Sequence, residues 1–250
     1  MFKLVYGNGS RFRSIFLGLA RPLSSIPIRV TPSGLEFRAL TSDNNMMVEA
    51  TFPSNVFESI EAASDTTLAL SRDGFLRSVK RAGKRDTITI QYEKASRYLR
   101  LLLTNVKTGV EREFSIEISE AITELIEPIQ VELPVRFQIS LEDFKKLIRD
   151  VIIVGDEVEL TYRDNSIEVS STSEGRSYKT SLALDRPLYL LESREDEVSS
   201  KYYVDYLKTV VSTLSITELI DVEFGSSLPL KIYASLEDGT KITTWIAPRV

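Results

Sequence analysis

Alternation of apolar and polar side chains is the dominant pattern along this chain. Short runs with an apolar residue at every second position are typical of strands that bury one face. In the first half, such runs lie at 2–6, 35–40, 46–52, 87–92, 98–103 and 114–118. In the second half, they lie at 136–139, 158–162, 166–170, 178–184, 222–224, 230–234 and 241–246. The pattern therefore predicts a protein rich in β-strands in both halves.

Four segments break this alternation, because their apolar residues recur at intervals of three and four, as in a helix. These segments lie at 12–23, 75–82, 141–151 and 206–214. Ser140 and Asp143 are predicted to cap the start of the third. Equivalent positions in the first and third helices are 132 residues apart, and those in the second and fourth are 131 apart. This spacing indicates that one arrangement occurs twice along the chain.

The segment 119–134 separates the two halves. It is acidic, contains two prolines and follows neither period. Such a segment predicts an extended connector. We therefore expect one domain at 1–118 and a second at 135–250, joined by 119–134.

Composition excludes several classes of protein. The chain has 250 residues, of which 42% are hydrophobic and 27% charged, as in soluble globular proteins. No apolar run approaches the roughly 20 residues of a membrane span, and the start lacks the apolar core of a signal peptide, so we expect a cytoplasmic protein. With no cysteine and no histidine, the chain has no disulfide, no thiol nucleophile and no Ser-His-Asp triad.

Positive charge is concentrated in two stretches of an otherwise acidic chain. The chain carries 31 basic and 36 acidic residues, which gives a net charge of −5. Nine of the basic residues but one of the acidic residues lie in 10–23 and 72–85, that is, in the first two predicted helices and the residues that flank them. A local basic excess of this kind indicates a polyanionic ligand.

Helical projection places these cations opposite the apolar faces. They are Arg11, Arg13 and Arg21 in the first helix, and Arg77, Lys80, Arg81 and Lys84 in the second. Such side chains neutralise phosphates without reading base edges, which predicts salt-sensitive binding that is indifferent to sequence. The alternative is a solvated helix face without a ligand. The third and fourth helices have nearly balanced charge.

Several short motifs follow one another along the whole chain. They are MFKLVY at 1–6, GLEFRAL at 34–40, LRSVKRA at 76–82, FKKLIRD at 144–150, YVDYLKTVV at 203–211, VEFG at 222–225, LPLKIY at 228–233 and WIAPRV at 245–250. In this order they resemble the sliding clamp family typified by proliferating cell nuclear antigen, and its archaeal members in particular. The closing WIAPRV is the most specific of them.

The resemblance implies an α+β DNA clamp fold. Two topologically similar domains, each with two helices packed on antiparallel β-sheets, would assemble into a trimeric ring whose helices line a hole for duplex DNA. Several archaeal clamps are paralogous subunits of heterotrimers, so the resemblance does not decide between a homotrimer and a heterotrimer. The DNA-facing positions, together with their basic neighbours, are Arg11, Arg13, Arg77, Lys80, Arg81, Lys84, Lys146 and Arg149.

The family also docks partner enzymes through a short peptide beside the connector. The matching pocket positions are Leu40, Met47, Leu125, Ile126, Pro229, Trp245, Ala247 and Pro248. An extended segment offers backbone pairing, and aliphatic walls accept a helical turn that carries aromatic anchors. Without the resemblance, Leu40 and Met47 are ordinary strand residues of a core. Asn45 stands where an apolar wall residue is common, which leaves the choice of partner open.

Subunits of the family pair through edge strands, here 112–118 and 176–183. The implied contact residues are Glu111, Glu113, Phe114, Arg176, Tyr178 and Lys179. An exposed strand edge needs protection or a partner, and ring closure supplies the partner. Opposite charges on the two edges are expected to set the pairing.

The function implied is that of a non-enzymatic DNA sliding clamp and processivity factor without metal or cofactor. It would tether DNA polymerase, clamp loader, flap endonuclease and DNA ligase to duplex DNA. An alternative within the family is a specialised checkpoint-type clamp subunit. Alternatives from other classes are an acidic scaffold without nucleic acid and a carboxylate-dependent metal hydrolase. For the hydrolase, Glu157, Glu159 and Asp164 cluster in sequence, but their spacing makes no persuasive ligand set.

Overall fold

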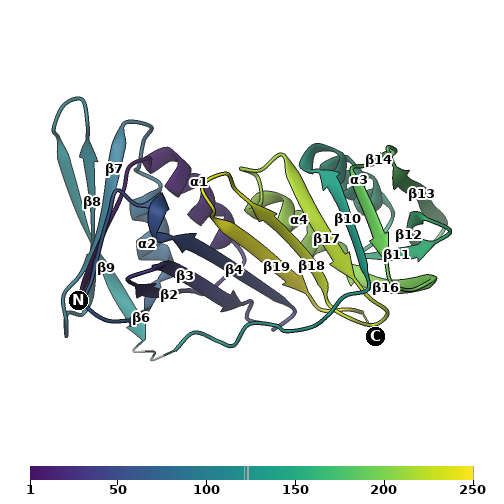
Figure 1. Cartoon of the computed structure of the whole chain (residues 1–250), viewed down its shortest axis with the longest axis horizontal. Coiled ribbons are helices and arrows are strands. Elements are labelled where there is room, and N and C mark those ends of the chain that lie inside the picture. Colours follow the sequence, from purple (N-terminus) through teal and green to yellow (C-terminus); the bar gives the residue numbers. More distant parts are fainter. Residues whose placement is uncertain (121, 123, 250) are drawn as a thin grey trace. The chain divides into compact units, whose positions relative to one another are not determined.

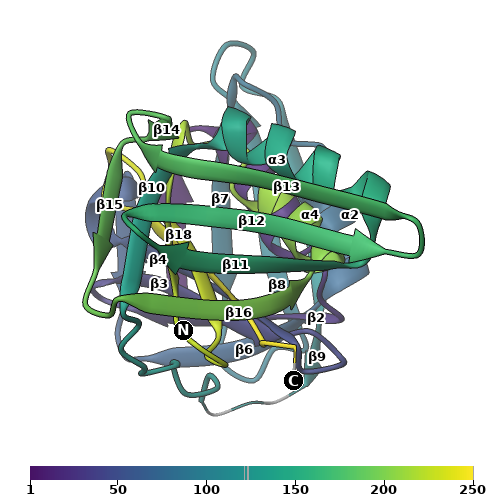
Figure 2. The same ribbon diagram turned by 90° about the vertical axis from the view of Figure 1, so that its right-hand side faces the viewer.

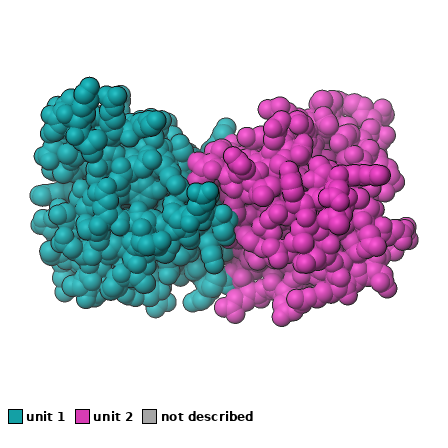
Figure 3. All heavy atoms as spheres, turned by 45° about the horizontal axis from the view of Figure 1, so that its top comes forward, with its two compact units in different colours: residues 1–44, 48–128, 235–242 teal, residues 45–47, 129–234, 243–250 magenta. Residues whose placement is uncertain are grey.

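A computed structural model describes residues 1–120, 122 and 124–249 of the chain. The expected connector includes positions 121 and 123, and the closing motif includes 250, so these parts of the two predictions lie outside the described residues. The chain forms two compact units, coloured separately in Figure 3. Unit 1 comprises 1–44, 48–128 and 235–242, and unit 2 comprises 45–47, 129–234 and 243–250. The predicted boundaries at 118 and 135 stay a prediction.

Unit 1 holds two helices and a run of antiparallel strands (Figure 1). Its elements are β1 (Phe2–Tyr6), α1 (Gly9–Leu19), β2 (Ser25–Thr31), β3 (Gly34–Leu40), β4 (Met46–Pro53), the 3-10 helix η1 (Ser54–Val56), β5 (Ser59–Ala62), β6 (Thr66–Ser71), α2 (Arg72–Val79), β7 (Asp86–Tyr92), β8 (Tyr98–Asn105) and β9 (Glu111–Glu120). The strands lie in the order β4-β3-β2-β6-β9-β8-β7-β1-β5.

Unit 2 repeats this plan with two sheets. Its elements are β10 (Val135–Ser140), α3 (Leu141–Val154), β11 (Glu157–Arg163), β12 (Ser166–Ser173), β13 (Arg176–Leu184), β14 (Pro187–Leu188), β15 (Leu190–Ser193), β16 (Glu197–Tyr203), α4 (Val204–Thr213), β17 (Leu219–Phe224), β18 (Leu230–Ser235) and β19 (Lys241–Ile246). One sheet has the order β15-β10-β17-β18-β19 and the other β14-β13-β12-β11-β16. Figure 2 shows the second sheet in front of α3, which packs on β12, β13 and α4.

The two units fill the space under their helices differently. In unit 1 the rings of Phe12, Phe16 and Phe75 form one aromatic cluster, with centroids 4.4 Å apart for Phe12 and Phe16 and 5.2 Å for Phe16 and Phe75. In unit 2 the buried residues of α3 and α4 are almost all aliphatic. The apolar period of each predicted helix thus marks the face that is buried.

The third helix begins where the sequence predicts, the other three begin two or three residues before their predicted segments, and the first two end before their predicted ends. Ser140 Oγ accepts the Asp143 N–H at 3.0 Å, which confirms the predicted capping pair. The first helix was expected to reach 23 but ends at Leu19, because Pro22 has no N–H to continue it. The second was expected to continue through 82 but ends at Val79, and a tight turn follows it. The strands β2, β5, β6, β14, β15 and β16 were not predicted.

Candidate functional site

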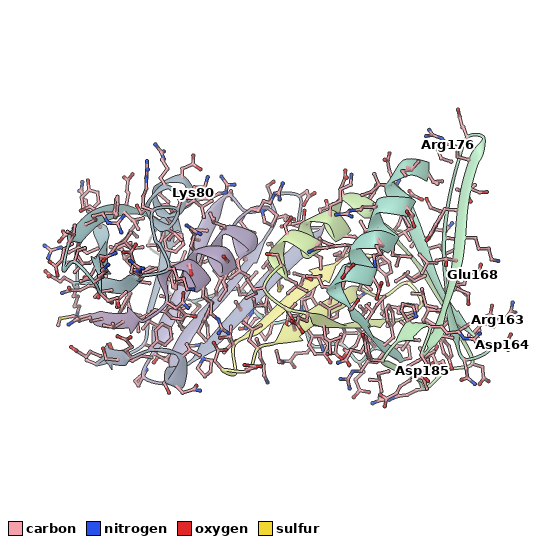
Figure 4. All side chains as sticks on the ribbon, turned by 90° about the horizontal axis from the view of Figure 1, so that it is seen from above. Lys80, Arg163, Asp164, Glu168, Arg176 and Asp185 are labelled. Carbon is pink, nitrogen blue, oxygen red and sulfur yellow. The ribbon has the colours of Figure 1, made fainter. Side chains whose placement is uncertain are left out.

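A group of exposed cations follows the end of α2. We call residues 80–85 the cationic loop; its four basic residues, Lys80, Arg81, Lys84 and Arg85, are all exposed. Within the described part of the chain, no ion pair or side-chain hydrogen bond engages these four side chains. In Figure 4, Lys80 projects away from the end of its helix. Because α2 stops at Val79, the predicted helical face for Arg81 and Lys84 was wrong: both lie on the turn.

A buried carboxylate shapes this loop from inside. The Asp86 side chain is only 4% exposed. It accepts the Gly83 N–H at 2.7 Å, an amide N–H of Asn105 at 3.2 Å and a guanidinium N–H of Arg112 at 2.6 Å. Burial on its own would raise the pKa of Asp86, but the hydrogen bonds from Gly83, Arg112 and Asn105 hold that pKa below its ordinary value.

The remaining predicted cations of unit 1 are engaged locally. Arg11 pairs with Asp238 at 2.8 Å. Arg13 donates from Nη1 to the Ala82 carbonyl at 2.9 Å, so it ties α1 to the cationic loop. Arg77 is exposed, and its Nε donates to the Asp73 carbonyl at 3.2 Å. Their positive charge is present, but Arg11 and Arg13 also hold the unit together.

In unit 2, neighbouring acids offset most of the helical positive charge. Lys146 on α3 lies 3.0 Å from Glu142 and 3.3 Å from Asp143, and the hydrogen bonds that its ammonium donates to these two carboxylates raise its pKa. Lys208 on α4 lies 2.6 Å from Asp205. Arg149 is exposed, and no described residue pairs with its side chain. Within the residues described, Arg149 is therefore the stronger candidate for phosphate contact of the two predicted on α3.

Both predicted edge strands are open along most of their length. Residues 111–117 of β9 pair with β8 on one side, and β6 joins the other side only from Ile118 onward. Residues 176–182 of β13 pair with β12 alone, and β14 joins at Ala183 and Leu184. In the described chain, β9 and β13 therefore each present a free edge of about the length that strand pairing requires.

Three of the four charged residues predicted on these edges already have partners in their own unit. Glu113 lies 3.8 Å from Arg100, and Lys179 lies 2.7 Å from Glu168. Arg176 donates to the Ile153 carbonyl at 2.9 Å. Glu111 is exposed, and Phe114 and Tyr178 are half-buried; burial, and then the nearby Asp150 charge, raises the pKa of Tyr178.

Sequence reasoning missed one residue beside the β13 edge. Ile153 in the last turn of α3 is 67% exposed, although it is large and apolar. Its carbonyl accepts the bond from Arg176, so it lies next to the open strand. The run of four apolar residues at 151–154 was the available signal, because a helix can bury only some of four consecutive side chains.

The predicted peptide-pocket residues differ in exposure. In unit 1, Leu40 and Ile126 are exposed and Leu125 is half-buried. Arg38 donates to the Ile126 carbonyl at 2.8 Å and pairs with Glu49, which fixes this part of the connector on β3. In unit 2, Pro229, Ala247 and Pro248 are half-buried. Met47 and Trp245 are only 5% and 6% exposed, so in the isolated chain they lie beneath the predicted docking surface and contribute little area to it.

Two further properties concern the alternatives. Within residues 1–120, 122 and 124–249, no cluster of three or more acidic side chains is arranged to hold a metal ion. None of the helices in that part of the chain is long and apolar enough to cross a membrane.

Comparisons with known proteins give full-length matches. The chain is 29% identical to DNA polymerase sliding clamp 2 of Sulfurisphaera tokodaii and 27% identical to DNA polymerase sliding clamp 1 of Saccharolobus solfataricus, with 100% of each chain covered. It superposes on the crystal structure of PCNA from Thermococcus kodakaraensis with a TM-score of 0.90, at 21% identity and over 100% of both chains. No protein-family model matches the chain. The structural likeness confirms the predicted α+β fold with its two helices per unit.

Proposed function

We propose that this chain, which belongs to the DNA polymerase sliding clamp family, is a processivity factor that encircles duplex DNA and tethers replication and repair enzymes to it. The observation that carries the proposal is the set of exposed cations on the cationic loop, none of them paired with a described residue, in a protein whose net charge is −5. An acidic protein binds DNA poorly as a whole. A ring, however, is retained by closure, and its cations need only allow it to slide.

DNA contact would come mainly from the first unit. The proposed DNA-facing residues remain Arg11, Arg13, Arg77, Lys80, Arg81, Lys84, Lys146 and Arg149, and Arg85 joins them because it is exposed on the same loop. Because Arg11 and Lys146 already pair with carboxylates, they add less net attraction for phosphate than Lys80 or Lys84 does. Binding of this kind is independent of DNA sequence.

Ring closure would use the open edges of β9 and β13. A strand edge in one chain and a different edge in the next form a heterologous contact, which closes into a ring when the rotation fits. The proposed contact residues are Glu111, Glu113, Phe114, Arg176, Tyr178 and Lys179. The ring is a trimer of copies of this chain or of this chain with paralogous clamp subunits.

Partner enzymes would dock through a short peptide on Leu40, Met47, Leu125, Ile126, Pro229, Trp245, Ala247 and Pro248. DNA polymerase, the clamp loader, flap endonuclease and DNA ligase are the proposed partners, and the chain itself catalyses no reaction. We place its action in the cytoplasm, on chromosomal DNA. The checkpoint-type clamp and the metal hydrolase are less favoured, since the full-length relatives are named DNA polymerase sliding clamps.

Retention on circular DNA tests the proposal. The assembled protein, with its clamp loader, is loaded onto a nicked circular plasmid, and the bound fraction is measured before and after a restriction enzyme linearises the plasmid. A ring stays on the circle and slides off the ends of the linear form. Equal retention on both forms would contradict encirclement and favour an acidic scaffold or ordinary DNA binding.

A further inference from the structure

We infer that Arg249 is a positioning residue for partner docking: it fixes Ala247 and Pro248 in place as a preformed wall for the partner peptide. The inference rests on the proposed function, because it concerns the same docking surface. It adds a residue that does not itself line the pocket and assigns it a role in holding the pocket in shape.

Three contacts hold Arg249 on the sheet that contains β11 and β16. Its backbone N–H donates to the Lys201 carbonyl at 2.7 Å, and the two residues form an isolated antiparallel β-bridge. Its Nε lies 2.6 Å from a carboxylate oxygen of Glu157 on β11. Its guanidinium carbon lies 4.3 Å from the ring centroid of Tyr203 at the end of β16, a cation–π distance.

The segment 247–249 is thus held at both ends. At the first end, the Ala247 N–H donates to the Asn45 carbonyl at 2.9 Å. At the other end, Arg249 is bound to β16 and β11. Pro248, between them, has no N–H and a restricted φ, so it adds stiffness without adding a bond. The two proposed docking residues therefore lie on a short span between two anchors.

Anchoring matters because the segment lies beyond the last strand. β19 ends at Ile246. After it, the β-pairing described for the chain is the single bridge between Arg249 and Lys201. A chain segment without pairing loses order readily, and a peptide that binds to it must then restore that order. A segment that is already ordered avoids this cost, so the contacts of Arg249 should raise the affinity for the peptide.

The ion pair alone is too exposed to act strongly. The side chains of Arg249 and Glu157 are 44% and 41% exposed, and a surface pair of this kind contributes little by itself. The cation–π contact and the backbone bond act on the same residue, and together the three fix one conformation. We expect loss of the side chain to weaken peptide binding by about fivefold to tenfold.

The experiment compares Arg249→Ala with Arg163→Ala as a matched control. Arg163 is at the opposite end of β11 and makes a similar exposed ion pair, 3.2 Å from Glu197 on β16, but it has no bond to 247–249. Calorimetry of the assembled ring measures the affinity of a synthetic peptide that carries one aliphatic and two aromatic anchors on a helical turn. Hydrogen exchange of the Ala247 and Arg249 amides and the melting temperature are measured in parallel.

We expect Arg249→Ala to bind the peptide about fivefold to tenfold more weakly and to exchange both amides faster, while its melting temperature matches that of Arg163→Ala. The reversed pair, Arg249→Glu with Glu157→Arg, should recover part of the affinity that Arg249→Glu alone loses. Equal peptide affinity in Arg249→Ala and Arg163→Ala would overturn the inference, even if the melting temperature falls. A wild-type ring that binds no peptide would instead contradict the proposed docking surface itself.

Discussion

Arg112 on β9 donates to the buried Asp86 carboxylate at 2.6 Å, and its other terminal nitrogen donates to the Arg81 carbonyl at 3.2 Å. One side chain on the open strand edge therefore holds the loop that carries the exposed cations. In the proposed ring, the residue next to the subunit contact also positions the DNA-facing charge.

Replacing Asp86 with Asn should lower the free energy of unfolding by about 2 kcal/mol, because Arg112 loses its charged acceptor and the Gly83 N–H loses part of its bond strength. Urea unfolding followed by circular dichroism measures the change. Glu113→Gln is the control, since this carboxylate is exposed and 3.8 Å from Arg100. The control should change the free energy by less than about 0.5 kcal/mol, and an equal loss in both variants would contradict the role assigned to Asp86.

Acid should destabilise the protein partly through the same carboxylate. Hydrogen bonds lower the pKa of folded Asp86, so its contribution is fully present above the unfolded pKa of about 3.9 and is lost as pH falls through the lower folded value. Unfolding free energies measured from neutral pH down to about pH 2 should fall less steeply in Asp86→Asn than in the wild type. Parallel curves would show that Asp86 does not carry this pH dependence.

Local patterns were enough to predict most of the strands and to place the helix starts within three residues. The Ser140 cap involves residues three positions apart, and strand alternation depends only on neighbouring residues, so both are visible in sequence. The end of α2 is different. Asp86 binds Asn105 and Arg112 from distant strands, and this non-local network fixes the turn that stops the helix.

The sequence predicted which residue types form the candidate site better than it predicted whether each side chain is paired or buried. The cations of 80–85 follow from composition, but whether each is free depends on tertiary neighbours such as Asp238 beside Arg11. The burial of Met47 and Trp245 likewise depends on strands that pack from elsewhere in the chain. Strand β2 was missed because Pro27 interrupts its pattern. The pairing of β2 with β3 begins at Ile28, so Pro27 lies outside it.

The cationic loop should dominate DNA affinity. Replacing Lys80, Arg81, Lys84 and Arg85 with Ala should weaken duplex binding and reduce the slope of log K against log salt by about 0.9 for each phosphate that the variant no longer neutralises. Folding should be unaffected, because all four side chains are exposed. Fluorescence anisotropy over a salt series measures the slope.

A matched comparison on α3 sharpens this prediction. Arg149→Ala should reduce the slope more than Lys146→Ala, since Lys146 is neutralised by Glu142 and Asp143 whereas Arg149 has no described partner. Equal effects of the two variants would contradict the ranking. An unchanged slope in the loop variant would remove the cationic loop from the DNA contact.

Ile153 should stabilise the ring although it adds little to the single chain. It is 67% exposed beside the open β13 edge, and burying such a side chain in a contact contributes about 1.5–3 kcal/mol. Ile153→Asp should therefore weaken subunit association at least about tenfold, with the melting temperature of the single chain unchanged. Its main-chain bond to Arg176 does not depend on the side chain and should persist.

Sedimentation velocity over a concentration series, with this chain alone and mixed with paralogous clamp subunits, measures that association. Tyr98→Asp is the control: Tyr98 is also large and exposed, at 51%, but it lies on β8, whose residues 100–105 pair with β7 and 98–104 with β9. If Ile153→Asp abolishes association and Tyr98→Asp preserves it, the subunit interface includes the β13 edge. Association preserved in both variants would exclude Ile153 from the interface, because an aspartate cannot be buried there without a large loss of hydration energy.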